Sequence, residues 1–294
     1  MSEGFAQWLP CGSRESLRHP PSVRRLKPAR CHSRSGCMPC ASRIPPRRTL
    51  RLLLIITSLL PGGVLPAQQR TPPARLLFIG NSYTYWNDLP LMVRALADSA
   101  GLHRFQVEAV TAPGAALLDL WGEGAARNRI ATGQFDLVIM QQGPSSQPEG
   151  RQWLLAGVDS FAPEIRRAGG RPALYMVWPS RDRQRDFDAT RESYTLAAER
   201  VGGMLFPAGE AWRAAWRRDS TLSFYSRDDL HPTPLGSYLT ALVIVGELTG
   251  RSPVELPSRL AVGGMGGYTL VVPEPVATLL KAAAAEAIGV YGRR

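Results

Sequence analysis

The stretch Leu76-Leu77-Phe78-Ile79-Gly80-Asn81-Ser82-Tyr83-Thr84 decides the fold. A short apolar run ends on a glycine, a serine follows two residues later, and helical spacing begins after Asp88. An apolar run this short, flanked by helical sequence, is typical of a buried strand in a parallel sheet. Because open α/β sheets bind ligands at the carboxyl ends of their strands, Ser82 is the candidate nucleophile.

From residue 74 onward, apolar runs alternate with amphipathic stretches, which predicts a doubly wound α/β sandwich in a single domain. Five strands are expected, at about 75–79, 105–110, 135–140, 172–177 and 204–207. Helices are expected at about 89–100, 152–167, 187–200, 211–217, 235–248 and 275–290, with a weaker helical region at 117–130. Residues 251–272 are expected to be irregular, and the glycine-rich segment 263–267 to form a flexible loop that follows no strand.

The formal net charge of +11 lies almost wholly near the N-terminus. Residues 1–67 hold 11 Lys and Arg against 2 Asp and Glu, whereas the remainder holds 24 against 22. The part expected to fold therefore lacks the basic footprint of a nucleic-acid-binding protein. No nucleic-acid partner is expected.

Residues 1–67 are typical of a basic leader that ends in a secretory signal. Arg47, Arg48 and Arg51 precede the apolar run 52–60, and a small residue, Ala67, closes the segment. The run is too short to span a bilayer as a helix, so no stable membrane span is expected after cleavage. We expect a secreted or periplasmic protein.

Two further expectations concern this leader. The mature chain is expected to begin near Gln68, and the long region before the signal suggests a true translation start near Met38. A disordered basic arm with a short anchor is the alternative interpretation.

All four cysteines lie in the leader, at Cys11, Cys31, Cys37 and Cys40. Pro, Arg and Ser surround them without any strand or helix pattern, so a folded zinc module is not expected. The remaining chain has no cysteine and only two histidines. No metal site, cofactor or disulfide is indicated.

Of the two remaining histidines, His103 sits in a polar connection and His231 follows an acidic pair. Serine catalysis needs a base near the hydroxyl and a carboxylate to orient that base. An Asp three residues before a His, on one loop, can supply both, so Ser82, His231 and Asp228 could fill the three roles. Alternatively, Ser82 caps a helix and the acidic pair caps the next one.

Together these residues resemble the SGNH (GDSL-type) hydrolase superfamily over about residues 74–250. The resemblance rests on Gly80-Asn81-Ser82, Gly114, Gln142-Gly143 and Asp228-x-x-His231-Pro232. It implies a flavodoxin-like three-layer α/β/α sandwich with a central, mainly parallel five-stranded sheet, and a single hydrolase domain over 68–294. It also implies Ser82 as nucleophile, His231 as general base and Asp228 as the orienting carboxylate, with Asp229 fitting the spacing less well.

The same resemblance implies an oxyanion hole built from the backbone N–H groups of Ser82 and Gly114 and a side chain in the third block. There the usual Gly-x-Asn-Asp is replaced by Gly143-Pro144-Ser145-Ser146, and the Gln-Gly pair is similar to that of carbohydrate acetylesterase branches. Gln142 is the preferred third donor and Ser145 the alternative.

These expectations describe a secreted serine esterase that hydrolyses short-chain, acetyl-type esters, on a carbohydrate, through an acyl-enzyme intermediate. The partner is a small-molecule or glycan ester; the oligomeric state is left open. The alternatives are a non-catalytic carbohydrate-binding protein with the same fold and an O-acyltransferase with the same triad. Four aromatic residues near the site could line a ligand or pack in the core: Tyr83, Tyr85, Trp86 and Trp178.

Overall fold

The computed structural model describes residues 75–102, 105–263 and 267–292. The expected leader, its four cysteines, the boundary at Gln68 and His103 lie outside the described residues, so the predictions made for them stay predictions. Within the described ranges, no helix is long and apolar enough to cross a bilayer.

A five-stranded parallel sheet forms the middle of the molecule, with the strand order β2-β1-β3-β4-β5. Its strands are β1 (Arg75–Gly80), β2 (Gln106–Thr111), β3 (Leu137–Met140), β4 (Arg171–Tyr175) and β5 (Met204–Phe206). In β1 the side chains of residues 76–79 are fully buried, because helices cover both faces of the sheet. This double burial explains why the strand reads as a continuous apolar run.

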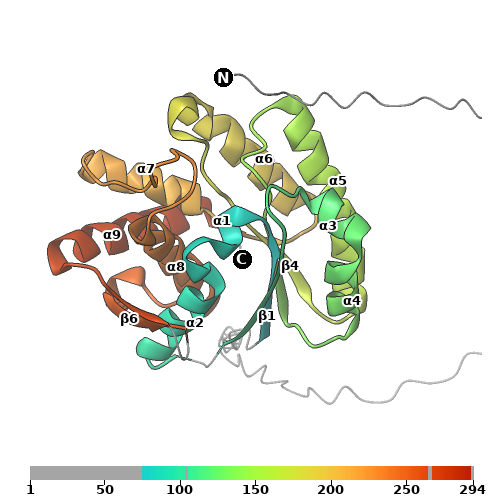
Figure 1. Cartoon of the computed structure of the whole chain (residues 1–294), viewed down its shortest axis with the longest axis horizontal. Coiled ribbons are helices and arrows are strands. Elements are labelled where there is room, and N and C mark those ends of the chain that lie inside the picture. The colour runs from blue at the N-terminus through green and yellow to red at the C-terminus, as the bar shows by residue number, and fades with distance from the viewer. Residues whose placement is uncertain (1–74, 103–104, 264–266, 293–294) are drawn as a thin grey trace, which may run out of the picture. The chain divides into compact units, whose positions relative to one another are not determined.

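Helices pack on both sides of the sheet (Figure 1). One layer contains α2 (Leu89–Ser99), α7 (Ala208–Arg218), α8 (Pro234–Thr249) and α9 (Glu274–Tyr291), and the other contains α3 (Leu117–Glu123), α4 (Ala125–Ala131), α5 (Pro148–Arg167) and α6 (Phe187–Arg200). Short helical segments are α1 (Ser82–Tyr85), η1 (Trp86–Asp88), η2 (Arg181–Asp186) and η3 (Pro253–Glu255). The predicted three-layer sandwich is confirmed, and all five of its strands are parallel.

Helix α8 follows the loop that carries His231 and fixes where that loop ends. Thr233 is its N-cap, with Oγ1 accepting from the Gly236 N–H at 3.3 Å, and Pro234 occupies the first helical position. The helix is buried along nearly its whole length and stops at Gly250, whose φ of +69° ends it in the left-handed region. His231 therefore lies two residues ahead of a firmly held helix start.

The prediction that residues 251–272 are irregular is wrong. They contain η3 and an antiparallel hairpin of β6 (Arg259–Val262) and β7 (Tyr268–Val271). Leu260 and Val262 point into the core while their neighbours are exposed, but four residues are too few for this alternation to stand out beside the glycines. The glycine-rich segment thus follows a strand and lies between the two arms of the hairpin; its residues 264–266 are outside the described part.

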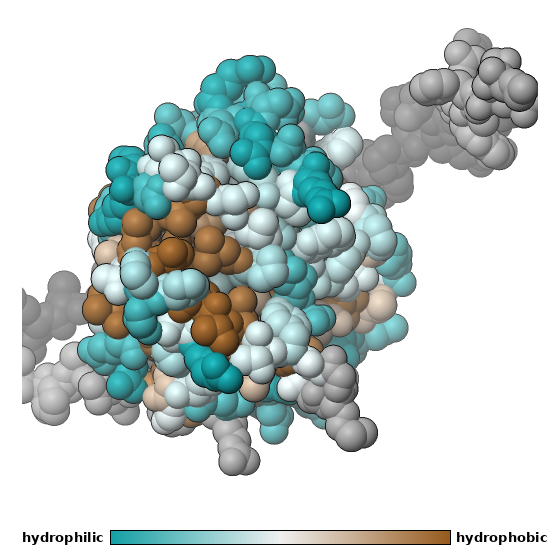
Figure 2. Space-filling model, turned by 60° about the vertical axis from the view of Figure 1, so that its left-hand side comes forward, coloured by the Kyte–Doolittle hydropathy of each residue, from teal (hydrophilic) through white to brown (hydrophobic). Residues whose placement is uncertain are grey.

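The side of the molecule that carries α7, α9 and the hairpin shows apolar residues among polar ones at its surface (Figure 2). Val254 of η3 and Val271 of β7 are among the large apolar side chains exposed in the described part of the chain. Beneath the surface, the apolar side chains of the parallel strands and of the helices on both faces form one continuous core.

Candidate active site

Ser82 follows the carboxyl end of β1, at the first position of the short helix α1. Asn81 is the N-cap: its Oδ1 accepts from the Tyr83 N–H at 3.2 Å, and its carbonyl accepts from the N–H groups of Thr84 and Tyr85. The capping role that was the alternative interpretation of Ser82 is thus performed by Asn81. Ser82 is half-buried and sits at the N-terminal end of the turn, where helical N–H groups lack intrahelical acceptors.

The side chain of Gln141, which is fully buried just after β3, anchors the Ser82 turn to the sheet. Gln141 Oε1 accepts from the Asn81 N–H at 3.1 Å and from Thr84 Oγ1 at 2.8 Å, while Nε2 donates to Asn81 Oδ1 at 2.9 Å. Thr84 Oγ1 also lies 2.9 Å from the Tyr175 hydroxyl. The sequence pattern indicates only a polar residue at a strand's exit for Gln141, and it does not reveal this anchoring role.

Gly80 leaves the space that this amide occupies. A Cβ at position 80 would lie 2.3 Å from Gln141 Oε1 and 2.4 Å from Thr84 Oγ1, closer than real Cβ contacts come. The glycine before the Asn-Ser pair is therefore required by a close approach.

The loop after β2 is bonded to the same turn on its other side. The Ala112 N–H donates to the Gly80 carbonyl at 3.2 Å, and Asn81 Nδ2 donates to the Ala115 carbonyl at 3.0 Å. Gly114 lies between these two contacts with a φ of +67°, in the left-handed region that favours glycine. The structure thus brings the predicted second block beside the Ser82 turn.

In the third block, which follows β3, the side chains of Gln142 and Ser145 already form hydrogen bonds within the protein. Gln142 Oε1 accepts from the Leu117 N–H at 3.1 Å, and Nε2 donates to Ser145 Oγ at 2.9 Å and to the Gly150 carbonyl at 3.2 Å. Both amide hydrogens of Gln142 are therefore engaged, and the two candidates for the third oxyanion donor are bonded to each other. Ser145, with a φ of +55°, also donates to the Gly143 carbonyl at 3.1 Å.

Asp228 and His231 form a closed unit on one loop. His231 Nδ1 lies 2.5 Å from Asp228 Oδ2, and Asp228 Oδ1 accepts from the backbone N–H groups of Leu230 and His231 at 3.1 and 2.9 Å. Asp229 instead forms an ion pair with Arg181, whose Nε lies 2.6 Å from Asp229 Oδ1. Of the two carboxylates, it is Asp228 that contacts the imidazole.

The hydrogen bonds to Asp228 favour its ionised form. Partial desolvation works against ionisation, but the bonds from the His231 ring, the Ser226 hydroxyl and the two backbone N–H groups hold the pKa of Asp228 well below its usual range. The carboxylate is therefore charged throughout the neutral range.

Contacts from the segment just after Ser82 hold the His231 loop. The indole of Trp86 stacks on the His231 ring with centroids 4.1 Å apart and planes at 13°, and Asn87 Nδ2 donates to the Pro232 carbonyl at 2.9 Å. The Tyr83 ring lies 6.3 Å from that of His231. His231 Nε2 is buried and has no hydrogen-bond partner among the described residues. A base with one nitrogen tied to a carboxylate and the other free thus lies against the segment that carries the serine.

The four aromatic residues near the site divide into two pairs. Tyr83 and Trp178 are buried and pack edge to face with ring centroids 5.4 Å apart, and Trp178 also stacks on Trp212 with centroids 3.6 Å apart. Burial raises the pKa of the Tyr83 hydroxyl, which stays neutral. Tyr85 and Trp86 remain more than one-third exposed.

We predict that Gly80→Ala destabilises the protein by about 1–3 kcal/mol, because the new methyl group would displace the Gln141 amide from the turn. Gly122→Ala is the matched control: it lies in α3, and a Cβ added there would have nothing within 4 Å, so alanine should be neutral or stabilise by about 0.5–1 kcal/mol. Urea unfolding measures both free energies of unfolding. Equal stability of the Gly80→Ala variant and the wild type would contradict the role assigned to this glycine.

We predict a pH-dependent loss of stability on Asp228→Asn. Because the folded pKa is depressed, the carboxylate contributes stability fully above its usual pKa of about 4 and loses it as the pH falls further. The difference in unfolding free energy between wild type and Asp228→Asn should therefore be present at pH 7, begin to shrink below about pH 5, and continue to shrink as the pH falls toward the depressed pKa of Asp228. Asp229→Asn, on the same loop, is the control, and a pH-independent difference for Asp228→Asn would refute the linkage.

Comparisons with known proteins bear on the fold. No family model matches this chain, and no curated protein matches it. A DUF4886 family protein from Bacteroides uniformis has a similar structure, with a TM-score of 0.56 and 17% identity, over 74% of this chain and 95% of that one. This likeness shows a shared fold.

Two further solved structures are similar over a smaller share of the chain. One, from Slackia heliotrinireducens, is assigned to the SGNH hydrolases (26% identity, TM-score 0.48, covering 58% of this chain and 96% of that one). The other is an acetylxylan esterase from Geobacillus stearothermophilus (15% identity, TM-score 0.46, covering 61% of this chain and 96% of that one). The parallel sheet in the order β2-β1-β3-β4-β5, with helices on both faces, confirms the α/β/α sandwich that the sequence predicted.

Proposed function

We propose that this protein is a secreted serine esterase that removes short, acetyl-type acyl groups from a carbohydrate. The observation that carries the proposal is the state of His231. Its Nδ1 is tied to Asp228, and its Nε2 is buried, without a partner among the described residues, against the segment that begins with Ser82. A serine hydroxyl activated for attack needs such a base.

In the proposed reaction, His231 Nε2 takes the proton of the Ser82 hydroxyl as Ser82 Oγ attacks the ester carbonyl carbon. The Asp228 carboxylate stays ionised, keeps the ring oriented through Nδ1 and stabilises the imidazolium that forms. His231 then gives the proton to the departing alcohol oxygen, which leaves an acyl group on Ser82. A water molecule, deprotonated by the same nitrogen, then attacks the acyl carbon; the bond from that carbon to Ser82 Oγ breaks, His231 returns the proton to Oγ, and the acid is released.

The developing oxyanion would be stabilised by the N–H groups of Ser82 and Gly114 and by Gln142. The hydrogen bonds that flank Gly114 support its place beside the turn, because they fix the loop after β2 against Gly80 and Asn81. As a donor, Gln142 would redirect one of the N–H groups now bonded to Ser145 and Gly150. Preorganised donors of this kind contribute a few kcal/mol each to the transition state.

Two other functions use the same features. An O-acyltransferase would carry the acyl group on Ser82 and pass it to a sugar hydroxyl, so only the acceptor distinguishes it from the esterase. A non-catalytic carbohydrate-binding protein would need no base with a free nitrogen, and the intact Asp228–His231 pair therefore favours an enzyme.

We predict that Ser82→Ala lowers kcat for a short-chain chromogenic acetate by about 10⁴–10⁶-fold, because the nucleophile is removed. Ser160→Ala, whose hydroxyl bonds to the carbonyl of Ala156 in its own helix α5, should retain wild-type activity. Circular dichroism verifies that both variants fold. An inactive wild type, or a Ser82→Ala variant as active as wild type, would sink the esterase proposal.

We predict that Gln142→Ala lowers kcat by about 10²–10³-fold with little change in KM, as expected for a donor used in the transition state. Ser145→Ala should keep most of the activity, because it frees an amide hydrogen of Gln142 and removes no proposed donor. Gln142→Ala also loses the hydrogen bond from the Leu117 N–H, so the unfolding midpoint of each variant is measured to separate a loss of stability from a loss of activity. The reverse pattern, with Ser145→Ala inactive and Gln142→Ala active, would assign the third donor to Ser145.

A further inference from the structure

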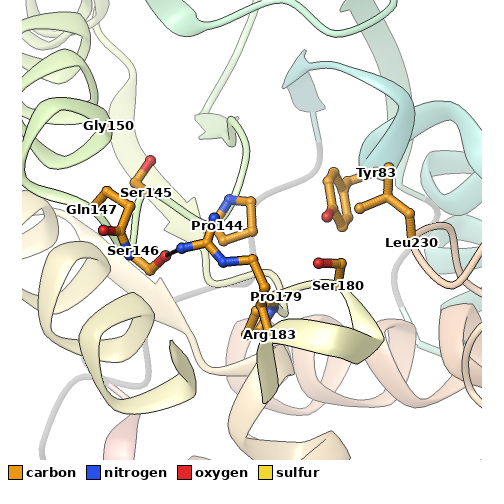
Figure 3. Close-up of a pocket in the computed structure, with 10 residues that line it drawn as sticks. All are labelled: Tyr83, Pro144, Ser145, Ser146, Gln147, Gly150, Pro179, Ser180, Arg183 and Leu230. Atoms are coloured by element: carbon orange, nitrogen blue, oxygen red, sulfur yellow. Dashed lines mark hydrogen bonds between the residues drawn. The ribbon is translucent and has the colours of Figure 1, made fainter. Parts of the chain in front are cut away.

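A pocket of about 300 Å³ opens beside the proposed catalytic residues (Figure 3). Most of its wall comes from the loops that follow β3 and β4, represented by Ser146 and Arg183. Tyr83 and Leu230 complete the wall, and they are the immediate chain neighbours of Ser82 and His231. One part of an ester bound at Ser82 would therefore enter this pocket.

Arg183 reaches into the pocket in a fixed position. Its Nε donates to Asp186 Oδ2 at 2.8 Å, its Nη2 contacts the same carboxylate, and Nη2 also donates to Ser146 Oγ at 3.4 Å. Asp186 is largely buried and further accepts from Ser146 Oγ at 3.3 Å and Gln147 Nε2 at 3.4 Å. The guanidinium is thus preorganised, which reduces the entropy lost when it binds a ligand.

The charges in this pocket favour a neutral polar ligand. The positive charge of Arg183 is balanced by Asp186 within the same cluster, so an anion would gain little there. An alkyl chain would bury the guanidinium N–H groups of Arg183 that Asp186 and Ser146 do not take, at a cost of about 1–3 kcal/mol for each unsatisfied group. Hydroxyl groups can both accept from the guanidinium and donate to serine oxygens.

The rest of the wall suits the ring of a sugar. Pro144, Pro179 and Leu230 offer small apolar surfaces that fit C–H groups, between the polar side chains. The Tyr83 hydroxyl, buried and without a partner among the described residues, belongs to the wall opposite Arg183, and Figure 3 shows it directed toward the space between them. An acetyl group needs far less than 300 Å³, which leaves this pocket to the alcohol part of the ester.

We propose that this pocket binds the neutral, polyhydroxylated alcohol part of the substrate, and that Arg183 is a residue that determines specificity for it. The proposal rests on the esterase function proposed above and names the part of the substrate that the pocket recognises. Arg183 takes no part in proton transfer or in the attack.

The test compares two acetate esters that differ only in their alcohol: a mono-O-acetyl methyl glucoside and 1-naphthyl acetate, which has no hydroxyl groups. Arg183→Met should lower kcat/KM for the sugar ester by about 10–100-fold, the equivalent of one charge-assisted hydrogen bond, and change that for 1-naphthyl acetate by less than about 3-fold. Arg185→Met is the matched control, since Arg185 lies on the same η2 segment and 3.9 Å from the same Asp186 but is 79% exposed and outside the pocket wall. It should leave both rates unchanged.

Equal losses on both esters, or no loss on either, would overturn the proposal. Saturation-transfer NMR with unacetylated methyl glucoside examines the pocket without turnover: wild type and Ser82→Ala should bind the sugar, and Arg183→Met should bind it at least about 10-fold more weakly. Sugar binding that depends on Arg183 in a protein that hydrolyses neither ester would refute the esterase function and retain the site. Hydrolysis of both esters without such binding would refute the site and retain the esterase.

Discussion

The absent side chain of Gly80 is the constraint on which the site depends. Because no Cβ stands there, the amide of Gln141 reaches from the end of β3 to the backbone of Asn81 and the hydroxyl of Thr84. Moving a buried amide away from its hydrogen-bond partners costs free energy, so Gln141 fixes the turn that carries Ser82 to the end of β3. The loop with Gly114 is bonded to this same turn and takes its position from it.

The next residues of the same segment contact the loop of the proposed base, His231. Asn87 and Asp88 both have positive φ values, +55° and +53°, in a conformation that costs non-glycine residues free energy. The resulting kink separates η1 from α2 and accompanies two contacts, Trp86 stacked on His231 and Asn87 bonded to Pro232. One short segment thus holds the proposed nucleophile, Ser82, at its start and contacts the loop of the proposed base, His231, at its end.

The sequence predicted what local patterns encode. Apolar runs located all five parallel strands to within about two residues, and the spacing of Asp228 and His231 anticipated their contact. It did not predict the role of Gln141, because whether a buried amide finds partners depends on which strands are neighbours. The sequence did not predict the β6–β7 hairpin, because its strands are short. It did not predict the pocket that contains Arg183, because loops distant in the sequence form its wall.

The proposed catalytic residues and most of the proposed binding pocket come from different parts of this fold. Ser82 and His231 depend on the end of β1 and the loop before α8, whereas most of the pocket wall comes from the loops after β3 and β4. The residues of these loops that hold the proposed site, such as Gln141 and Arg181, are not the ones that line the pocket, so the pocket-lining residues can change without displacing the proposed nucleophile or base. Arg183 joins the loop after β4 to the loop after β3 through its bonds to Asp186 and Ser146. These same bonds fix its guanidinium in the wall of an open pocket, which is the arrangement that the proposed binding of a ligand requires.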